Sequence, residues 1–313
     1  MTLPGPPPKI SETILEELWF GEDDSTAITA QAAASFAAAL ADLEGLRPFS
    51  DVARRVLECV ADPEYEIGHL QRIMEQDPAL ASKVLRLSNS AAFRPREPCA
   101  SIKQAIVVLG SRVLSEVATS LSLMSMFSDI SGVGRAVRDH CASTAALVRS
   151  LASRKANTAS NSYIVGLLHD FGKLLLIQAQ PGTYLKIHGP DIAEPDTIHL
   201  REREILGYDH AVLGAHVLKK WGLPDIVPKI VAWHHQPVRA FAAGGDVALH
   251  VALVRLAERV DRMLSTETSP GDSAMAHLAT APECEYVGFK LRDLTEMWDE
   301  LVSVKHEAEQ MFK

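Results

Sequence analysis

The sequence lacks several features that define large classes of proteins, beginning with paired cysteines. Its 313 residues contain four widely separated cysteines and no C-x-x-C pair: Cys59, Cys99, Cys141 and Cys284. Neither a disulfide framework nor a zinc site made of thiolates is therefore expected. A reducing cytoplasm fits this composition best.

An excess of basic residues is also missing. The chain has 31 Lys and Arg against 40 Asp and Glu, which gives a formal net charge of -9. Such a protein lacks the broad positive surface that contacts a phosphate backbone, and no cluster of aromatic and basic residues is present. We therefore expect no nucleic-acid partner.

Long uninterrupted apolar runs are absent as well. The opening stretch, MTLPGPPPKI, has no basic region followed by an apolar core, so it is not typical of a signal peptide. The most apolar window, 105–127, is interrupted by Arg112 and Glu116, which argues against a membrane span. The sequence predicts a soluble, cytoplasmic protein without membrane association.

Continuous alternation of period two is not found, whereas helix boundaries recur along the whole chain. Asp77 followed by Pro78 predicts a helix start, because Asp caps the first turn and proline is tolerated at the first helical position. Gly110 and Gly207 are expected to end helices in a left-handed conformation. With 47% hydrophobic residues available for a core, the sequence predicts an all-α fold of many short helices.

The first 44 residues differ from the rest. Residues 1–9 are rich in Pro and Gly and are expected to be disordered. Residues 11–43 are predicted to form one or two helices. The second, Ala-rich over 26–43, could pack on the main body or on a second chain.

The segment 163–178, YIVGLLHDFGKLLLIQ, places His169, Asp170 and Lys173 inside what is otherwise a buried apolar helix. An ionised carboxylate removed from water needs a partner or a metal. Neighbouring helical residues project about 100° apart, so other segments would have to supply further ligands.

Candidate ligands lie in several other helical segments. They are His140 at the start of an amphipathic helix, His210 near a helix start, His234 and His235 at a helix end, and Glu258 and Asp261 on a later helix. Each histidine taken alone is explained as well by hydrogen bonding at a helix terminus. The remaining histidines belong to no such pattern and are expected to be structural or solvent-facing: His69, His188, His199, His216, His250, His277 and His306.

Imidazole and carboxylate ligands together suit one or two divalent ions, with Fe or Mn preferred and Zn, Ni or Co as alternatives. Asp170 could bridge two ions, and two metals about 3.5 to 4 Å apart can promote an in-line displacement at phosphorus. Lys173, one turn after His169, could reach a phosphate oxygen. Asp170 and Lys173 are therefore the candidate catalytic residues.

At these motifs the sequence resembles the HDOD domain, the HD-related output domain of bacterial signalling, within the superfamily of HD and HD-GYP phosphohydrolases. The matching stretches are LQRIMEQDPALASKVLRLSNSAAF, SIKQAIVVLG, GLLHDFGKL and EREILGYDHAVLGAHVLKKWGLPDIVPKIVAWHHQP. The resemblance covers roughly 45–265. It implies an N-terminal helical part over 45–130, an HD-like helical bundle over 131–265, and C-terminal helices over 266–313 that pack on the HD-like part.

The resemblance also implies a ligand set. His140, His169 and Asp170 match the first HD ligands, while His210, His234 and His235 match the additional histidines of HD-GYP phosphodiesterases. Two positions depart from these families. Glu258 stands where HD proteins have an aspartate, and the loop after His235 lacks the Gly-Tyr-Pro motif, so recognition of cyclic-di-GMP is not supported.

Two functions follow from the resemblance. The preferred one is a bacterial signalling protein that acts through protein partners and carries a metal site, since HDOD members commonly serve as regulatory modules. The alternative is a metal-dependent phosphodiesterase or phosphohydrolase acting on a nucleotide or cyclic dinucleotide. A nucleotide ligand and a homodimer remain open.

Overall fold

The computed structural model describes residues 30–44, 51–62, 64–89, 97–124, 127, 132–155, 161–189, 197–266 and 270–310. These residues form 17 α-helices and no strand, which confirms the predicted all-α fold. The tail over 1–9 and the first of the two predicted N-terminal helices lie outside the described residues.

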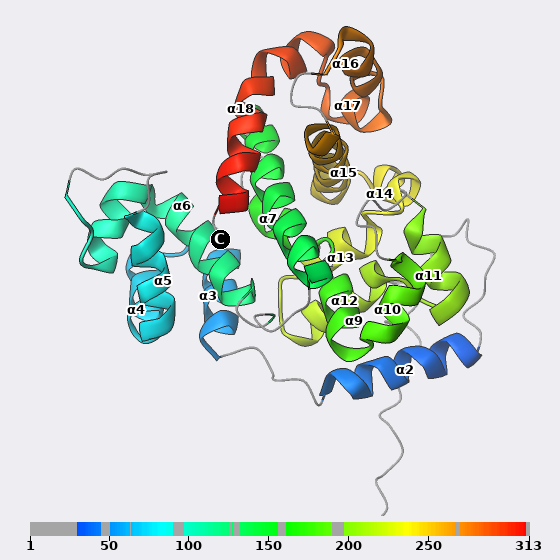
Figure 1. Cartoon of the computed structure of the whole chain (residues 1–313), viewed down its shortest axis with the longest axis horizontal. Coiled ribbons are helices and arrows are strands. Elements are labelled where there is room, and N and C mark those ends of the chain that lie inside the picture. Colours follow the sequence, from blue (N-terminus) through cyan, green and yellow to red (C-terminus); the bar gives the residue numbers. More distant parts are fainter. Residues whose placement is uncertain are drawn as a thin grey trace, which may run out of the picture.

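An N-terminal lobe packs around its own hydrophobic core (Figure 1). It consists of α3 (Asp51–Ala61), α4 (Ile67–Glu75), α5 (Pro78–Ser88) and α6 (Ile102–Met124), both halves of which contribute to this core. The predicted cap of α5 is confirmed, because Oδ1 of Asp77 accepts hydrogen bonds from the backbone N–H groups of Ala79 (2.9 Å) and Leu80 (3.0 Å).

Helix α6 is sharply bent at Gly110. This glycine has φ 77°, as predicted for a helix end, but a new helical segment follows it directly. In the part of the chain that the structure describes, no single helix is long and apolar enough to cross a membrane. The two halves of α6 meet that test only when joined across a bend of 112°.

The larger body begins with α7, which lies at its centre. Its helices are α7 (Gly132–Ser153), α8 (Ser162–Leu168), α9 (Phe171–Ala179), α10 (Pro181–His188), α11 (Ile198–Leu206), α12 (His210–Lys220), α13 (Ile226–Trp233), α14 (Pro237–Ala243), α15 (Gly245–Thr266), α16 (Asp272–Ala279), α17 (Pro282–Val287) and α18 (Leu291–Gln310). Helix α7 packs against α8, α15 and α18, with α18 running along it in Figure 1. A Cβ on Gly166 of α8 would lie 2.7 Å from Cα of Ala145, so the glycine lets α7 and α8 approach closely.

The Ala-rich helix α2 (Ala30–Glu44) packs on the main body, against α9 and α11. Its Phe36 is fully buried, and its ring meets those of Tyr208 and His216 edge-on at centroid distances of 5.1 and 5.4 Å. Figure 1 shows α2 lying across the base of this body.

Polar contacts connect the N-terminal lobe to the larger body through the second half of α6. The hydroxyls of Ser120 on α6 and Tyr163 on α8 are 2.6 Å apart, and Glu116 on α6 forms an ion pair with Arg149 on α7. Since α8 ends immediately before His169, these contacts fix the N-terminal lobe to the helix that leads into the candidate site.

Candidate metal centre

The segment around His169 and Asp170 is a junction between two helices. The sequence predicted one helix through this segment, and that prediction is wrong: α8 ends at Leu168 and α9 begins at Phe171. Asp170, with φ -101° and ψ 14°, departs from helical geometry. Its Oδ2 lies 3.4 Å from Nε2 of His169, so the break brings together two side chains that a regular helix would direct about 100° apart.

One oxygen of Asp170 faces the histidines of α12 and α13. Oδ1 lies 3.1 Å from Nε2 of His210 and 3.8 Å from Nε2 of His234. Nε2 of His235 is 3.1 Å from Nε2 of His210. His210 begins α12 and His234 follows the last residue of α13, as the sequence predicted. We call Asp170, His210, His234 and His235 the Oδ1 half of the site.

The other oxygen faces α7 and α8. Oδ2 of Asp170 lies 3.6 Å from Nε2 of His140 and 3.4 Å from Nε2 of His169, which is itself 3.9 Å from Oε1 of Glu258. We call His140, His169 and Glu258, together with Oδ2, the Oδ2 half. The extra methylene of Glu258 therefore does not keep its carboxylate away from the cluster. His140, predicted at a helix start, instead lies well inside α7, which begins eight residues earlier at Gly132.

The seven residues that match the family ligand positions thus lie together in two adjoining groups, whereas Asp261, the other candidate, is in neither group. In each group, one ligand atom per residue falls within 4.8 Å of the others: Asp170, His210, His234 and His235 in the first, and His140, His169 and Glu258 in the second. Lys173, the other candidate catalytic residue, has its Nζ 3.0 Å from Oδ2 of Asp170.

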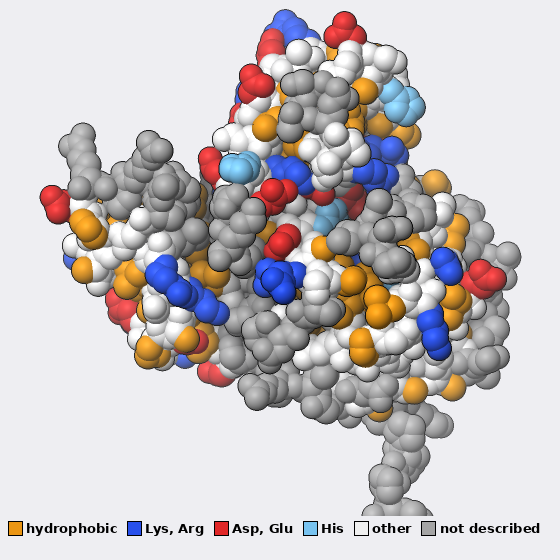
Figure 2. All heavy atoms as spheres, in the orientation of Figure 1, with side chains coloured by type: hydrophobic (Ala, Val, Ile, Leu, Met, Phe, Trp, Pro, Cys, Tyr) orange, Lys and Arg blue, Asp and Glu red, His pale blue; other side chains and the backbone are white. Residues whose placement is uncertain are grey.

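The cluster is buried on one side and open on the other. The side chains of His169, His210 and His234 have no solvent exposure, whereas those of His140 and Glu258 are 27% and 17% exposed. Figure 2 shows acidic and basic side chains and a histidine gathered near the centre of the face, where α7 and α15 lie in Figure 1. A molecule from solution would therefore approach along the His140 side.

Two histidines are held in the tautomer that a metal ligand requires. Nδ1 of His169 lies 2.7 Å from the carbonyl oxygen of Gly166, and Nδ1 of His234 lies 2.7 Å from that of Val231. Because a carbonyl only accepts, Nδ1 must carry a proton, and a neutral ring then has its lone pair on Nε2. Both Nε2 atoms are buried without a hydrogen-bond partner. Unpaired nitrogens of this kind fit a metal ion.

Two further histidines use Nδ1 in the same way, with carboxylates as the acceptors. Nδ1 of His140 lies 2.9 Å from Oδ2 of Asp261, and Nδ1 of His210 lies 2.6 Å from Oε2 of Glu202. Nε2 of His188 lies 2.8 Å from the other oxygen of Glu202. Sequence reasoning assigned Glu202 no role, although it lies within the stretch that resembles the HDOD domain.

The charges in the cluster depend on these contacts. Burial tends to raise the pKa of Asp170, but Lys173 and then His169 hold it well below its usual value. Burial tends to lower the pKa of His210, yet the carboxylates of Glu202 and Asp170 together raise it to about 10. Burial, with the neighbouring imidazoles, lowers the pKa of His234 well below its usual value, so this ring is neutral at pH 7.

His199 joins the cluster from α11, although the sequence gave no reason to place it there. Its ring stacks on that of His235, with centroids 4.3 Å apart and planes 7° from parallel. Burial lowers the pKa of His199 to about 4, so it packs as a neutral ring. It thereby buttresses the outermost histidine of the Oδ1 half.

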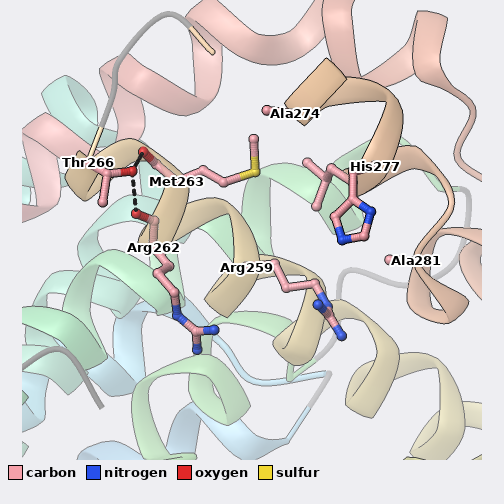
Figure 3. A pocket seen from close by; sticks show the side chains of 8 residues that line it. Arg259, Arg262, Met263, Thr266, Ala274, His277 and Ala281 are labelled. Atoms are coloured by element: carbon pink, nitrogen blue, oxygen red, sulfur yellow. Dashed lines mark hydrogen bonds between the residues drawn. The ribbon is translucent and has the colours of Figure 1, made fainter. Parts of the chain in front are cut away.

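A separate cavity of about 340 Å³ lies between α15 and α16 (Figure 3). Arg259, Met263 and His277 are among its lining residues, and none of the seven proposed ligands lines it. Arg259 immediately follows Glu258, so at about 100° per residue the two side chains leave α15 in different directions. Helix α15 thus serves the metal cluster with one face and this cavity with another.

The fold and the cluster define an all-α protein with a candidate metal-binding site of histidines and carboxylates. The HDOD domain family matches residues 46–237. The chain therefore belongs to the HDOD family. Glu258, Asp261 and helix α18 lie beyond the matched residues.

Similar proteins support the same fold. A crystal structure from Shewanella amazonensis SB2B, provisionally assigned as a phosphohydrolase, superposes with a TM-score of 0.69 at 21% identity, covering 88% of this chain and 98% of that one. An HDOD domain protein of unknown function from Geobacter sulfurreducens gives a TM-score of 0.68 at 20% identity, covering 89% and 98%.

A curated relative is an uncharacterised protein of Treponema pallidum (strain Nichols), 25% identical over 202 residues. The match covers 64% of this chain but only 39% of the relative's length.

Proposed function

We propose that this chain binds two divalent metal ions, one at each oxygen of Asp170. The division of the Asp170 carboxylate carries the proposal, because Oδ1 faces the Nε2 atoms of His210 and His234 while Oδ2 faces those of His140 and His169. Carboxylates that bridge imidazole-rich sites suit Fe or Mn, with Zn, Ni or Co as alternatives.

We further propose that the metal centre serves bacterial signalling in the cytoplasm, through protein partners. Membership of the HDOD family supports this function. The four free cysteines are all buried, as suits a reducing compartment. Val107, on the first half of α6, is 82% exposed and Val108 beside it is 37% exposed, which gives the N-terminal lobe apolar surface for a partner or a second copy.

Hydrolysis of a phosphodiester, with a nucleotide or cyclic dinucleotide as substrate, is the second candidate function. Two contacts favour it. Glu258 completes the ligand group at Oδ2, and Lys173 places a cation beside the same oxygen. The provisional assignment of the Shewanella protein as a phosphohydrolase points in the same direction.

The residues would divide the work of such a reaction. Two divalent ions, when bound by these residues, would supply an activated water and neutralise charge at phosphorus. Asp170 stays ionised and holds the two halves in register, while the Nδ1 hydrogen bonds keep the imidazole rings from turning. Lys173 lies 3.0 Å from Asp170 and can place its ammonium group against a non-bridging phosphate oxygen.

Metal analysis followed by turnover tests these functions. Purified full-length protein is expected to hold about two Fe or Mn per chain, and Asp170→Ala is expected to remove both while the helical circular dichroism persists. A wild-type protein that binds no ion, or an Asp170→Ala variant that retains both, would overturn the metal centre.

The same preparations decide between the two functions. Bis(p-nitrophenyl) phosphate and cyclic dinucleotides are the substrates to test with added Mn²⁺ or Fe²⁺. Hydrolysis that Asp170→Ala abolishes would favour the enzyme. Ion binding without turnover, together with metal-dependent capture of another signalling protein or a metal-dependent dimer seen by light scattering, would favour the signalling function.

A further inference from the structure

Each half of the cluster is backed by a buried carboxylate that is not itself among the proposed ligands. Glu202 accepts a hydrogen bond from Nδ1 of His210 in the Oδ1 half, and Asp261 accepts one from Nδ1 of His140 in the Oδ2 half. The side chain of Glu202 is fully buried and that of Asp261 is 9% exposed. Buried carboxylates are costly unless their partners are fixed, so both are built into the fold.

Asp261 fixes the orientation of His140. Its Oδ2 lies 2.9 Å from Nδ1 of His140, and this contact leaves Nε2 of the same ring facing Oδ2 of Asp170 at 3.6 Å. The side chain of His140 is 27% exposed, whereas those of His169, His210 and His234 have no exposure, so packing restrains the His140 ring less than it restrains theirs. Without Asp261 the imidazole would be free to turn over or to adopt the other tautomer.

Asp261 is in turn held by the C-terminal helix. Its Oδ1 pairs with the ammonium group of Lys305 on α18, and the same Nζ lies 3.1 Å from Oγ of Ser265. One and a half turns earlier on α18, the carboxylate of Glu300 accepts hydrogen bonds from Ser150 (2.7 Å) and Arg154 (2.6 Å), both near the end of α7.

Helix α18 is therefore connected to the Oδ2 half, which contains His140, through two sets of contacts. Glu300 ties it to α7, the helix that carries His140, and Lys305 ties it to the carboxylate that orients this histidine. Nothing comparable reaches the Oδ1 half from α18 in the described residues, since Glu202 is held there by His188, His210 and the backbone N–H of His210.

We propose that Asp261 and Glu202 are positioning residues, one for each half of the metal centre. Through Lys305, the position of the C-terminal helix α18 then determines how well the Oδ2 half binds its ion. The inference rests on the proposed metal function and adds to it a means of regulation. A partner that moved α18 would change the occupancy of one ion and leave the other in place.

Variants in which only one half of the metal centre is intact make the test specific. In full-length His234→Ala the Oδ1 half is impaired, so titration with Co²⁺ reports the Oδ2 half; in His140→Ala it reports the Oδ1 half. Outer carboxylates around a metal ligand contribute about 10- to 100-fold in metal affinity. Adding Asp261→Asn to His234→Ala is therefore expected to weaken Co²⁺ binding by about this factor and to shift the visible absorption of the bound Co²⁺.

In the His140→Ala protein the same Asp261→Asn substitution is expected to change neither the affinity nor the spectrum. Glu202→Gln should behave in the opposite way, weakening Co²⁺ binding in His140→Ala and not in His234→Ala. Lys305→Met should follow Asp261→Asn with a smaller effect. Its matched control is Arg292→Met, which removes an exposed ion pair with Glu296 on the same helix.

The outcomes separate the inference from the function on which it rests. Wild-type protein that binds no Co²⁺ would overturn both. Two bound ions in wild type, with Asp261→Asn weakening both halves equally or neither, would overturn the positioning roles and leave the metal centre standing. Thermal unfolding of the metal-free variants checks the fold, and Asp261→Glu, which restores a carboxylate, should recover part of the lost affinity if its role is to orient His140.

Discussion

Nε2 of His210 lies 3.1 Å from Oδ1 of Asp170, a residue 40 positions earlier in the chain. The opposite nitrogen of the same ring lies 2.6 Å from Glu202, so each ring nitrogen faces a carboxylate oxygen. This arrangement stabilises the imidazolium form and accounts for the raised pKa of His210, despite the burial that opposes it. A metal ion in the Oδ1 half must therefore replace the proton on Nε2.

Metal binding at neutral pH should consequently release a proton from His210. The pKa of His210 is about 10, so at any lower pH the metal-free ring carries both protons and metal binding releases about one of them. The apparent metal affinity should therefore rise with pH until the pH reaches this pKa. Calorimetry of Mn²⁺ binding in buffers of different ionisation enthalpy measures the number released.

Glu202→Gln provides the control for this proton. The amide removes the charge that raises the pKa of His210, so fewer protons should be released at pH 7. Equal proton release by wild type and Glu202→Gln, or none by wild type, would contradict the assignment of the imidazolium to His210.

The sequence predicted the helices, and which side chains lie together, better than it predicted the local geometry of the cluster. Asp77, Gly110 and Gly207 mark helix ends as expected, because capping and positive φ are local properties that the residue type reveals. The break between His169 and Asp170 was missed. Its flanks are apolar and helix-forming, and the close approach of α9 to α12 that accompanies the break is a tertiary contact.

The residues that orient the ligands were the hardest to find. Glu202 and His199 lie on a short helix, and their roles depend on how that helix packs against α12 and the end of α13. Asp261 was recognised as a candidate beside Glu258, but its contacts with His140 and Lys305 join residues 121 and 44 positions apart. No local pattern encodes such contacts.

Lys173→Met should separate phosphate binding from metal binding. Lys173 has its Nζ 3.0 Å from Asp170 but is not among the proposed ligands, so the variant is expected to retain both ions. Its affinity for inorganic phosphate, measured by calorimetry on metal-loaded protein, should fall about tenfold, which corresponds to about 1.4 kcal/mol. Lys173→Arg keeps the charge and should lose less. Unchanged phosphate affinity in Lys173→Met would remove Lys173 from the proposed site.

Glu283 should make the protein sensitive to acid. Its carboxylate is buried between Arg255 (2.7 Å) and Arg259 (3.2 Å), joining α17 to α15. Burial raises the pKa of Glu283, but Arg255, a backbone hydrogen bond and Arg259 together lower it more, so the net pKa is below its usual value. A depressed pKa stabilises the fold fully above the unfolded value of 4.5, and this contribution is lost as the pH falls through the folded pKa.

Urea unfolding at pH 7 and pH 4 checks this dependence. Glu283→Gln should lower the free energy of unfolding at pH 7 by about 3 kcal/mol, because it leaves two guanidinium groups without their buried partner. It should also flatten the loss of stability on acidification. Glu296→Gln, in an exposed pair with Arg292, is the control and should change stability by less than about 1 kcal/mol. Identical acid dependence in wild type and Glu283→Gln would contradict the role of this carboxyl.

Gly172→Ala should disturb the metal centre without replacing a proposed ligand. An added Cβ would lie 1.9 Å from the carbonyl oxygen of His210 and 3.0 Å from the backbone N of Gly214, so α9 and α12 would have to separate. Because backbone cannot yield as a side chain does, we expect a loss of stability of several kcal/mol, or about 1 to 3 kcal/mol where the helices can shift. The shift would carry His210 away from Oδ1 of Asp170.

The expected signature is a selective defect. Co²⁺ titration of Gly172→Ala should show weaker binding at the Oδ1 half, while the half formed by His140, His169 and Glu258 retains its ion. Gly182→Ala is the matched control, since a Cβ there meets nothing within 4 Å and alanine favours the helix. If Gly172→Ala bound both ions like wild type and melted at the same temperature, the close contact of α9 with α12 would not be what holds His210 at Asp170.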